Sequence, residues 1–125
     1  MSQLAKMKPI IICYSKCGTC QKAEKWLKAN GIDYSYRPIK EENPTKVELE
    51  LWLKKSGLPV NKFFNTSGLL YKEHNMKDKI KVLSENELID MLALNGLMVK
   101  RPVLLAGDKV LLGFKEDEWK KILLK

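Results

Sequence analysis

Residues Cys13 to Ala23 read CYSKCGTCQKA, and this stretch decides how the chain is interpreted. Two cysteines, Cys17 and Cys20, stand three positions apart, after an apolar run and ahead of a lysine-rich segment. Such a pair can be half of a zinc site, a disulfide that stabilises the fold, or a redox centre. The rest of the sequence distinguishes among these three.

The residues on either side of the pair predict a strand, a helix and a second strand. Pro9 to Tyr14 is an isoleucine-rich run, typical of a strand covered on both faces. Apolar residues recur at helical spacing from Cys20 to Leu27, and Asn30-Gly31 ends the helix. Asp33 to Ile39 then alternates, which predicts the second strand. We therefore expect a right-handed βαβ unit.

The middle of the chain is predicted to be helical. Thr45 to Glu48 and Ser84 to Glu87 are capping-box patterns, and each precedes an apolar periodic segment. Between these two helices, Asn65 to Gly68 predicts a turn, and a short helix is expected near Met76 to Val82.

The end of the chain predicts a ββα half. Pro102 to Leu105 and Val110 to Leu112 form an antiparallel hairpin, and Trp119 lies on the buried face of a last helix. The expected fold class is α/β: a four-stranded mixed sheet flanked by helices, with a helical insertion over about 44–97 between the two halves. We expect one domain over 1–125, because no linker is long enough to separate two.

Length and composition bound the class of protein. The chain has 125 residues, 45% hydrophobic and 30% charged, which suits one soluble domain that buries a core without disulfides or a structural metal. The first apolar run is too short for a signal peptide or a membrane span, which predicts a cytoplasmic protein with no membrane association. Cytosolic thiols are kept reduced, so the 3 cysteines favour catalytic, redox-sensing or metal-binding use.

The formal charge of +8 raises the question of a nucleic-acid partner. Nearly all of the positive charge is lysine, dispersed over many segments, and Arg37 and Arg101 are the only arginines. This dispersion favours solvated helix faces over a nucleic-acid groove. We expect no direct nucleic-acid binding.

The spacing of the pair suits a redox centre. Residues three apart in a first helical turn lie within reach of disulfide geometry. Cys17 stands at the helix start, where the helix dipole and the lysines at 16 and 22 favour the thiolate, so it is the expected nucleophile. Cys20 faces the core and is the expected resolving thiol. We expect the oxidised protein to contain a Cys17–Cys20 disulfide and a free Cys13, which burial in its strand keeps from either partner.

Two alternatives stay open for the cysteines. A zinc site needs four ligands, and beyond the pair the chain offers only Cys13 and His74, with no second CxxC or HxxxH. This makes zinc the weaker interpretation. The pair can also be two unreactive cysteines, because many thiols at helix starts do no chemistry.

Arg101-Pro102 directly precedes a predicted central strand, where proline removes a ladder hydrogen bond. This placement favours a turn or a cis peptide bond. Arginine offers a planar, bidentate fork for an anion. The alternative is a surface arginine at a strand start that makes an ordinary ion pair.

Four segments together resemble a known family: KCGTCQKAEKWL, FFNTSG, KRPVL and GFKEDEW, in this order from about Pro9 to Leu123. They are similar to the arsenate reductase (ArsC)-like branch of the thioredoxin superfamily, which also holds the Spx-type transcriptional regulators. The resemblance implies a thioredoxin-like fold, Cys17 as the active-site cysteine and Arg101-Pro102 as the family's Arg–cis-Pro pair.

The resemblance also sets expectations for substrate and reductant. Glutaredoxin-coupled arsenate reductases of this branch hold the oxyanion with three arginines, of which this sequence matches Arg101, while the other two positions are Asn65 and Phe114. Arsenate reduction is therefore expected to be absent or marginal. Cys20 fills a position that is usually serine, and an internal resolving thiol indicates disulfide exchange or redox sensing.

The sequence thus predicts a cytoplasmic thiol–disulfide oxidoreductase with no bound cofactor. Cys17, Cys20 and Arg101 are the expected catalytic residues, and Gly18, Thr19 and Pro102 are expected to position a thiol or disulfide substrate. Glutathione, glutaredoxin or thioredoxin is the expected electron donor. The alternative is an Spx-like redox-sensing regulator that binds RNA polymerase through its α subunit.

Overall fold

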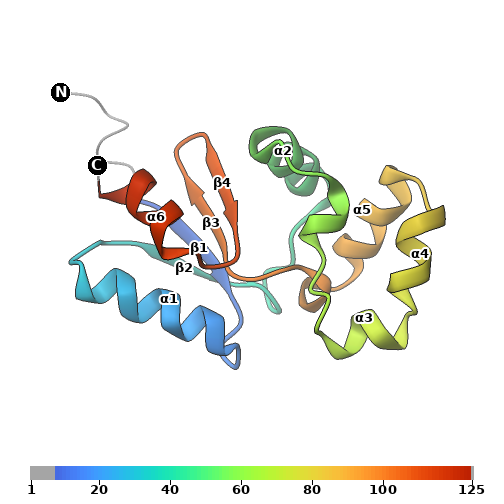
Figure 1. Ribbon diagram of the computed structural model, residues 1–125, viewed down its shortest axis with the longest axis horizontal. Helices are drawn as coiled ribbons and strands as arrows, with labels where there is room; N and C mark the ends of the chain where they lie inside the picture. Colours follow the sequence, from blue (N-terminus) through green and yellow to red (C-terminus); the bar gives the residue numbers. More distant parts are fainter. Residues whose placement is uncertain (1–7, 125) are drawn as a thin grey trace. The chain divides into compact units, whose positions relative to one another are not determined.

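The isoleucine-rich run before the cysteine pair forms β1 (Ile10–Cys13), an inner strand of a four-stranded sheet in the computed structural model, which describes residues 8–124 (Figure 1). β1 runs parallel to β2 (Ser35–Pro38) and antiparallel to β3 (Val103–Ala106). β3 also pairs antiparallel with β4 (Lys109–Leu112), which gives the order β2-β1-β3-β4. The α/β class and the four-stranded mixed sheet are confirmed.

The described residues divide into two units, which are considered one at a time. Residues 8–38 and 101–124 contain the sheet, and residues 39–100 form the second unit. The predicted helical insertion at about 44–97 falls inside this second range. Residues 1–7 and 125, which the predicted single domain included, lie outside the described residues.

The core of the first unit lies between the sheet and two helices. Both α1 (Gly18–Ala29) and α6 (Glu116–Leu123) pack on one face of the sheet. The strand residues that contact them are alternate ones, because alternate residues of a strand point to the same side. Side chains from the strands and both helices form one buried cluster: Ile11, Cys13, Cys20, Ala23, Leu27, Leu104 and Trp119.

An aromatic cluster joins α1 to α6. The Phe114 ring centroid lies 5.9 Å from that of Trp26 and 4.9 Å from that of Trp119. The two tryptophan rings meet edge to face, with centroids 6.3 Å apart. Trp119 is fully buried, and its indole N–H donates to the carbonyl of Gly113 at 3.2 Å, so burying this polar group costs little.

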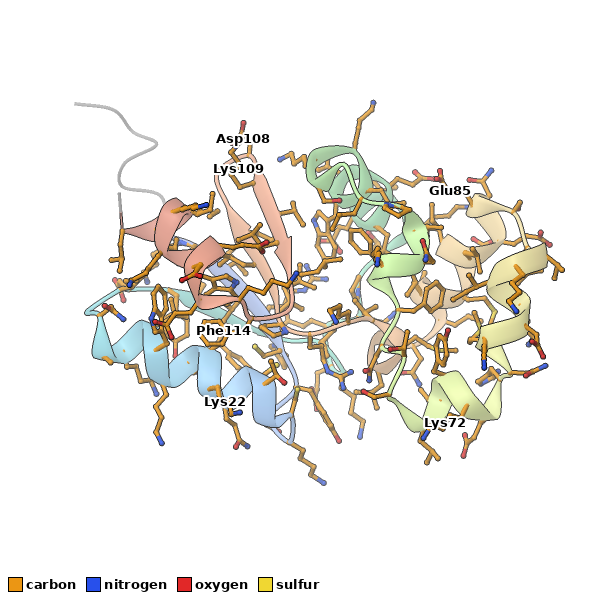
Figure 2. The ribbon with its side chains drawn as sticks, viewed as in Figure 1. Lys22, Lys72, Glu85, Asp108, Lys109 and Phe114 are labelled. Atoms are coloured by element: carbon orange, nitrogen blue, oxygen red, sulfur yellow. The ribbon has the colours of Figure 1, made fainter. Side chains whose placement is uncertain are left out.

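The predicted hairpin is present. Ala106 pairs with Lys109, which leaves a two-residue turn of Gly107 and Asp108. Gly107 has φ +60, in the left-handed region that such turns need and that glycine adopts at no steric cost. Asp108 and Lys109 mark the tip of the hairpin in Figure 2.

The second unit is helical, as predicted. Its short connections Val60–Phe63 and Gly96–Met98 were not predicted, because runs of three or four residues show no periodicity. Its elements in chain order are α2 (Lys46–Ser56), η2 (Val60–Phe63), α3 (Leu69–Glu73), α4 (Met76–Val82), α5 (Glu85–Leu94) and η3 (Gly96–Met98).

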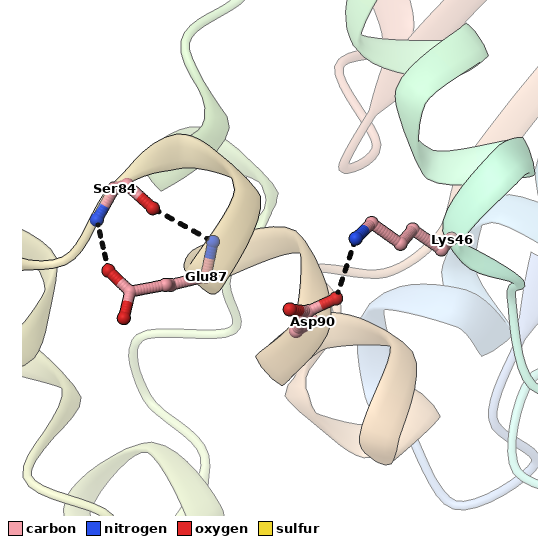
Figure 3. A network of polar contacts seen from close by, with 4 residues as sticks. All are labelled: Lys46, Ser84, Glu87 and Asp90. Atoms are coloured by element: carbon pink, nitrogen blue, oxygen red, sulfur yellow. Dashed lines mark hydrogen bonds and ion pairs between the residues drawn. The ribbon is translucent and has the colours of Figure 1, made fainter.

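Both predicted capping boxes are confirmed. The Thr45 hydroxyl accepts from the Glu48 N–H at 3.1 Å, and the Glu48 carboxylate accepts from the Thr45 N–H at 3.0 Å. Ser84 and Glu87 repeat the arrangement at 3.2 and 2.9 Å, as Figure 3 shows. Each box satisfies two donors that the helix itself leaves unpaired, and a cap of this kind contributes about 1 kcal/mol.

An ion pair and a hydrogen bond connect α2, and the residues just before it, to α5. The Lys46 ammonium lies 3.1 Å from the Asp90 carboxylate (Figure 3). Just before α2, the Asn43 side-chain amide donates to the Ala93 carbonyl at 2.6 Å. The amide therefore satisfies a carbonyl in the last turn of α5, where the helix provides no donor.

The segment around residues 64–68 contains the predicted turn. The Gly68 N–H donates to the Asn65 carbonyl at 3.1 Å, which closes the turn. Phe64 and Val99 form an isolated antiparallel bridge, and the Asn65 N–H donates to the Met98 carbonyl at 2.8 Å. A single bridge has no sequence pattern, and it was not predicted.

Gly96 provides a test of packing in the second unit. An added Cβ at this position would overlap the backbone carbonyl of Ile39 and lie 2.7 Å from the Asn43 side-chain oxygen. We expect Gly96→Ala to lower the free energy of unfolding by about 1–3 kcal/mol, because backbone cannot move aside cheaply. Urea unfolding of the reduced protein measures this loss.

Gly18→Ala is the matched control, because a Cβ at Gly18 meets nothing within 4 Å and alanine favours a helix. Its stability should equal or exceed that of the wild type. Equal stability of Gly96→Ala and wild type would contradict the close approach at Gly96.

Candidate active site

A short turn between β1 and α1 places Cys17. The Cys17 N–H donates to the Tyr14 carbonyl at 2.9 Å, and the Cys17 carbonyl accepts from the Gln21 N–H at 3.1 Å. Cys17 is thus the N-cap of α1, with φ −92 and ψ 119, and its side chain makes no capping hydrogen bond. The side chain is half-buried, so a reactant can reach its sulfur.

The other two thiols are buried. Cys20, in the first turn of α1, is 1% exposed, and Cys13, the last residue of β1, is 0% exposed. Because α1 packs on the face to which Cys13 points, the Cys13 thiol meets and hydrogen-bonds the Cys20 sulfur. The expectation that burial keeps Cys13 from both other cysteines is therefore wrong.

The hydrogen bonds to Cys20 stabilise its thiolate. The Cys13 thiol makes the largest contribution and lowers the pKa of Cys20, while burial opposes it. The Tyr14 backbone N–H and the Cys17 thiol also donate to the Cys20 sulfur, and the charge of Arg101 acts in the same direction. Together they lower the pKa of Cys20 from 9.0 to about 7.

The same contact has the opposite effect on its donor. The hydrogen bond to Cys20 raises the pKa of Cys13, and burial raises it further. Cys13 therefore stays protonated and remains a donor. Cys20 is the central thiol of the three, because it accepts from both of the others.

These contacts add hydrogen bonds to Cys20 that the sequence did not predict. From sequence, the helix dipole and nearby lysines favoured a thiolate on Cys17. In the structure, three donors converge on Cys20, and Cys17 is one of them. A sulfur with several donors in a dry site holds a negative charge well, because the donors are already in place.

Arg101 is held beside the cysteines by an aromatic ring. Its guanidinium carbon lies 5.3 Å from the centroid of the Tyr14 ring, a cation–π contact. The Arg101-Pro102 peptide bond is cis, one of the two expected forms, and Pro102 is buried. The Pro102 carbonyl accepts from the Gly113 N–H at 2.8 Å, which anchors the pair at the start of β3.

Sequence reasoning missed the role of Tyr14. Its carbonyl closes the turn to Cys17, its N–H donates to Cys20, and its ring carries Arg101. The available signal was an aromatic residue at the end of a strand, three positions before the cysteine pair. That signal is weak, because tyrosine is common in strands.

Gly18 and Thr19 lie between the two reactive cysteines, in the first turn of α1, and both are exposed. The backbone N–H groups of a first helical turn have no acceptor within the helix and form the positive end of its dipole. This position suits the contact with a substrate that the sequence predicted for these two residues.

The two positions at which the resemblance led us to look for further arginines, 65 and 114, have other surroundings here. In the second unit, the Asn65 side-chain oxygen accepts from the Ser67 hydroxyl at 3.3 Å. In the first unit, Phe114 belongs to the aromatic cluster of Trp26 and Trp119, and Figure 2 shows it between α1 and α6. Neither position supplies a guanidinium group for an oxyanion.

Within residues 8–124, no group of three or more His, Cys, Asp and Glu side chains is arranged to hold a metal ion. His74, the remaining zinc-ligand candidate, lies at the end of α3 in the second unit. Over the same residues, none of the helices has the length and hydropathy to cross a membrane.

Comparison with known proteins identifies relatives that match most of the chain. The model of the ArsC family matches residues 13–122. The uncharacterized protein YusI of Bacillus subtilis is 47% identical over 108 residues, which cover 86% of this chain and 92% of that protein. The regulatory protein MgsR of the same species is 28% identical over 109 residues, covering 87% and 85%. The global transcriptional regulator Spx 2 of Bacillus anthracis is 28% identical over 114 residues, covering 91% and 86%.

Solved structures show the same fold. An ArsC family related protein from Bacteroides fragilis superimposes with a TM-score of 0.88 at 50% identity, covering 93% of this chain and 99% of that one. A Staphylococcus aureus protein solved by NMR superimposes with a TM-score of 0.83 at 38% identity, covering 94% and 99%.

The burial of the three thiols predicts their order of reaction with iodoacetamide. In the native, reduced protein, Cys17 should be alkylated first, because it is half-buried while Cys13 and Cys20 are enclosed. The other two should react only in denaturant. Peptide mass spectrometry after timed labelling, with and without urea, provides the measurement. Rapid native labelling of Cys20 would show that its sulfur is more accessible than the structure indicates.

Proposed function

Because this chain belongs to the ArsC family, we propose that it is a cytoplasmic thiol–disulfide oxidoreductase in which Cys17 attacks the substrate and Cys20 resolves the mixed disulfide. One observation carries the proposal: an accessible thiol at a helix N-cap hydrogen-bonds a buried thiol whose pKa is lowered to about 7. This arrangement provides a nucleophile, Cys17, and a second thiol, Cys20, which acts first as the base and then as the resolving thiol.

In the first step, the Cys17 sulfur attacks one sulfur of a substrate disulfide. The Cys17 proton passes to the Cys20 thiolate, to which it is already hydrogen-bonded. The substrate S–S bond breaks, one substrate sulfur leaves as a thiolate that takes a proton from water, and Cys17 is joined to the other. The N-terminus of α1 stabilises negative charge that develops on the Cys17 sulfur.

In the second step, Cys20 returns its proton to solvent and its thiolate attacks the Cys17 sulfur. The mixed disulfide breaks, the second substrate sulfur leaves as a thiolate, and a Cys17–Cys20 disulfide forms. The substrate has gained two electrons, which the pair has lost. The second leaving thiolate also takes its proton from water, and the pair, which began with one proton on Cys17, has released that one proton to solvent. A thiol reductant of the glutathione, glutaredoxin or thioredoxin class restores the dithiol, and no bound cofactor is needed.

Arg101 is proposed to orient an anionic group of the substrate. Its contact with the Tyr14 ring fixes the guanidinium in the unit that contains the cysteines. Bidentate contact with a carboxylate suits a thiol compound or peptide that carries one. Arsenate is not the proposed substrate, because Asn65 and Phe114 replace the other two arginines of the related reductases.

A second candidate function is redox-sensing regulation. The relatives named MgsR and Spx 2 favour it, because both are transcriptional or regulatory proteins of similar length. In this case the Cys17–Cys20 disulfide would alter a surface that contacts RNA polymerase at its α subunit, and the disulfide would act as a switch without turnover.

The oxidoreductase proposal predicts a trapped intermediate in Cys20→Ser. Without the resolving thiol, the mixed disulfide at Cys17 cannot be cleared. After exposure to oxidised glutathione, Cys20→Ser should accumulate a one-to-one glutathione adduct at Cys17. Intact-mass and peptide mass spectrometry identify the adduct and its position.

Cys17→Ser is the matched control and should trap no glutathione, because Cys20 is enclosed. An adduct on Cys20 in this variant, or no adduct on Cys17 in Cys20→Ser, would refute the assigned roles. Two unreactive cysteines would then be the better interpretation.

Capture by RNA polymerase distinguishes the two functions. If the protein is an oxidoreductase, the immobilised C-terminal domain of the polymerase α subunit should retain neither the reduced nor the disulfide form. Retention that differs between the two redox states would favour the regulator. A Cys17→Ser variant, which cannot form the disulfide, controls for binding that does not depend on redox state.

A further inference from the structure

The third cysteine of the chain has no part in the two steps above, yet it contacts the redox pair. Cys13 is fully buried at the end of β1, among the apolar side chains of the first unit's core. A buried cysteine in such surroundings is usually only a small apolar side chain. Here it lies in the same buried cluster as Cys20, and its thiol hydrogen-bonds the Cys20 sulfur.

We propose that Cys13 is a positioning residue of the redox pair: its S–H group donates to the Cys20 sulfur, stabilises the Cys20 thiolate and makes the Cys17–Cys20 disulfide easier to reduce. The effect on reduction of the disulfide rests on the proposed function, but the hydrogen bond can be tested without assuming that function.

The fold brings the donor to its acceptor. Ile11 and Cys13 are the residues of β1 that point into the helix-covered face, and Cys13 is the one nearest the turn to α1. The first turn of α1 carries Cys20 on its buried side. Both thiols are enclosed, and a hydrogen bond to a charged acceptor is strong where water cannot compete.

The direction of the effect follows from which redox state contains the thiolate. The thiolate of Cys20 exists only in the dithiol form, so a donor to it stabilises the reduced protein relative to the disulfide. The effect requires Cys20 to be ionised. It is therefore absent well below the pKa of Cys20, about 7, and grows as the pH rises through that value.

Other groups that act on the two sulfurs do not change when Cys13 is substituted, and the residue at position 17 is the same in the two proteins that are compared. Cys17, Arg101 and the Tyr14 backbone N–H act on Cys20 from the turn and from the residues before β3. Glu24 of α1 acts on Cys13, and its carboxylate accepts from the Tyr34 hydroxyl at 2.7 Å. A change in the titration of Cys20 on substitution of Cys13 therefore reports the lost donor.

The first experiment titrates Cys20 directly. In a Cys17→Ser background, isotope-labelled cysteine allows the Cβ chemical shift of Cys20 to be followed by NMR as a function of pH. Adding Cys13→Ala should raise the titration midpoint by about one pH unit, a tenfold fall in thiolate, because one charge-assisted hydrogen bond is lost. Adding Cys13→Ser instead should restore most of the shift, because its hydroxyl is also a donor.

Leu104→Val is the matched control for loosened packing, because Leu104 lies in the same buried cluster and offers no donor. Its Cys20 midpoint should equal that of the background. An unchanged midpoint in Cys13→Ala, or a shift of the same size in Leu104→Val, would overturn the proposal.

The second experiment measures the consequence for the disulfide. The protein with both pair cysteines is equilibrated with reduced and oxidised glutathione, and the Cys17–Cys20 disulfide is quantified. Above about pH 8, Cys13→Ala should shift the equilibrium about tenfold toward the disulfide, and the difference should vanish near pH 6.

A pH-independent shift, or a wild-type disulfide that joins Cys13 to Cys20, would overturn the proposal. A wild type that forms no Cys17–Cys20 disulfide would refute the proposed function, while the titration of Cys20 would still decide the role of Cys13.

Discussion

The turn that joins β1 to α1 is the constraint on which the first unit depends. Its hydrogen bond from Cys17 to Tyr14, at 2.9 Å, makes the helix begin immediately after the strand. A helix that starts so soon lies along the face of the strand that it leaves, so its buried side meets the inward residues of β1. The core, the position of the N-cap cysteine and the meeting of the thiols all follow from this one short connection. A longer turn would separate the packing of the core from the chemistry of the cysteines.

Local signals predicted most of the fold. The two capping boxes, the isoleucine-rich strand and the hairpin turn each depend on residues within a few positions of one another, and each is present. The short helices Val60–Phe63 and Leu69–Glu73 were missed because runs of four and five residues are too short to show helical periodicity. Element type was thus predictable wherever a segment carries its own start and stop signals.

The sequence predicted which cysteines form the site, but not which groups donate hydrogen bonds to them. Spacing alone placed Cys17 at the helix start and Cys20 in the core, and the structure agrees. The convergence of donors on Cys20 could not be predicted, because it requires Cys13 from the strand and the backbone of Tyr14 at the same sulfur. The sequence predicted that burial would separate Cys13 from the other two cysteines, whereas a buried side chain is in contact with whatever packs against it. Hydrogen bonds between elements are the part of a site that a linear pattern does not contain.

The aromatic cluster gives the molecule an internal optical reporter. Trp26 and Trp119 stand edge to face at 6.3 Å, close enough for their excited states to couple, and both belong to the first unit. The chain's remaining tryptophan, Trp52, is buried in the second unit. Coupled indoles produce a circular dichroism signal that disappears when their geometry is lost, and here both coupled indoles belong to the first unit. The loss of structure in the first unit can therefore be followed in the unlabelled protein by circular dichroism.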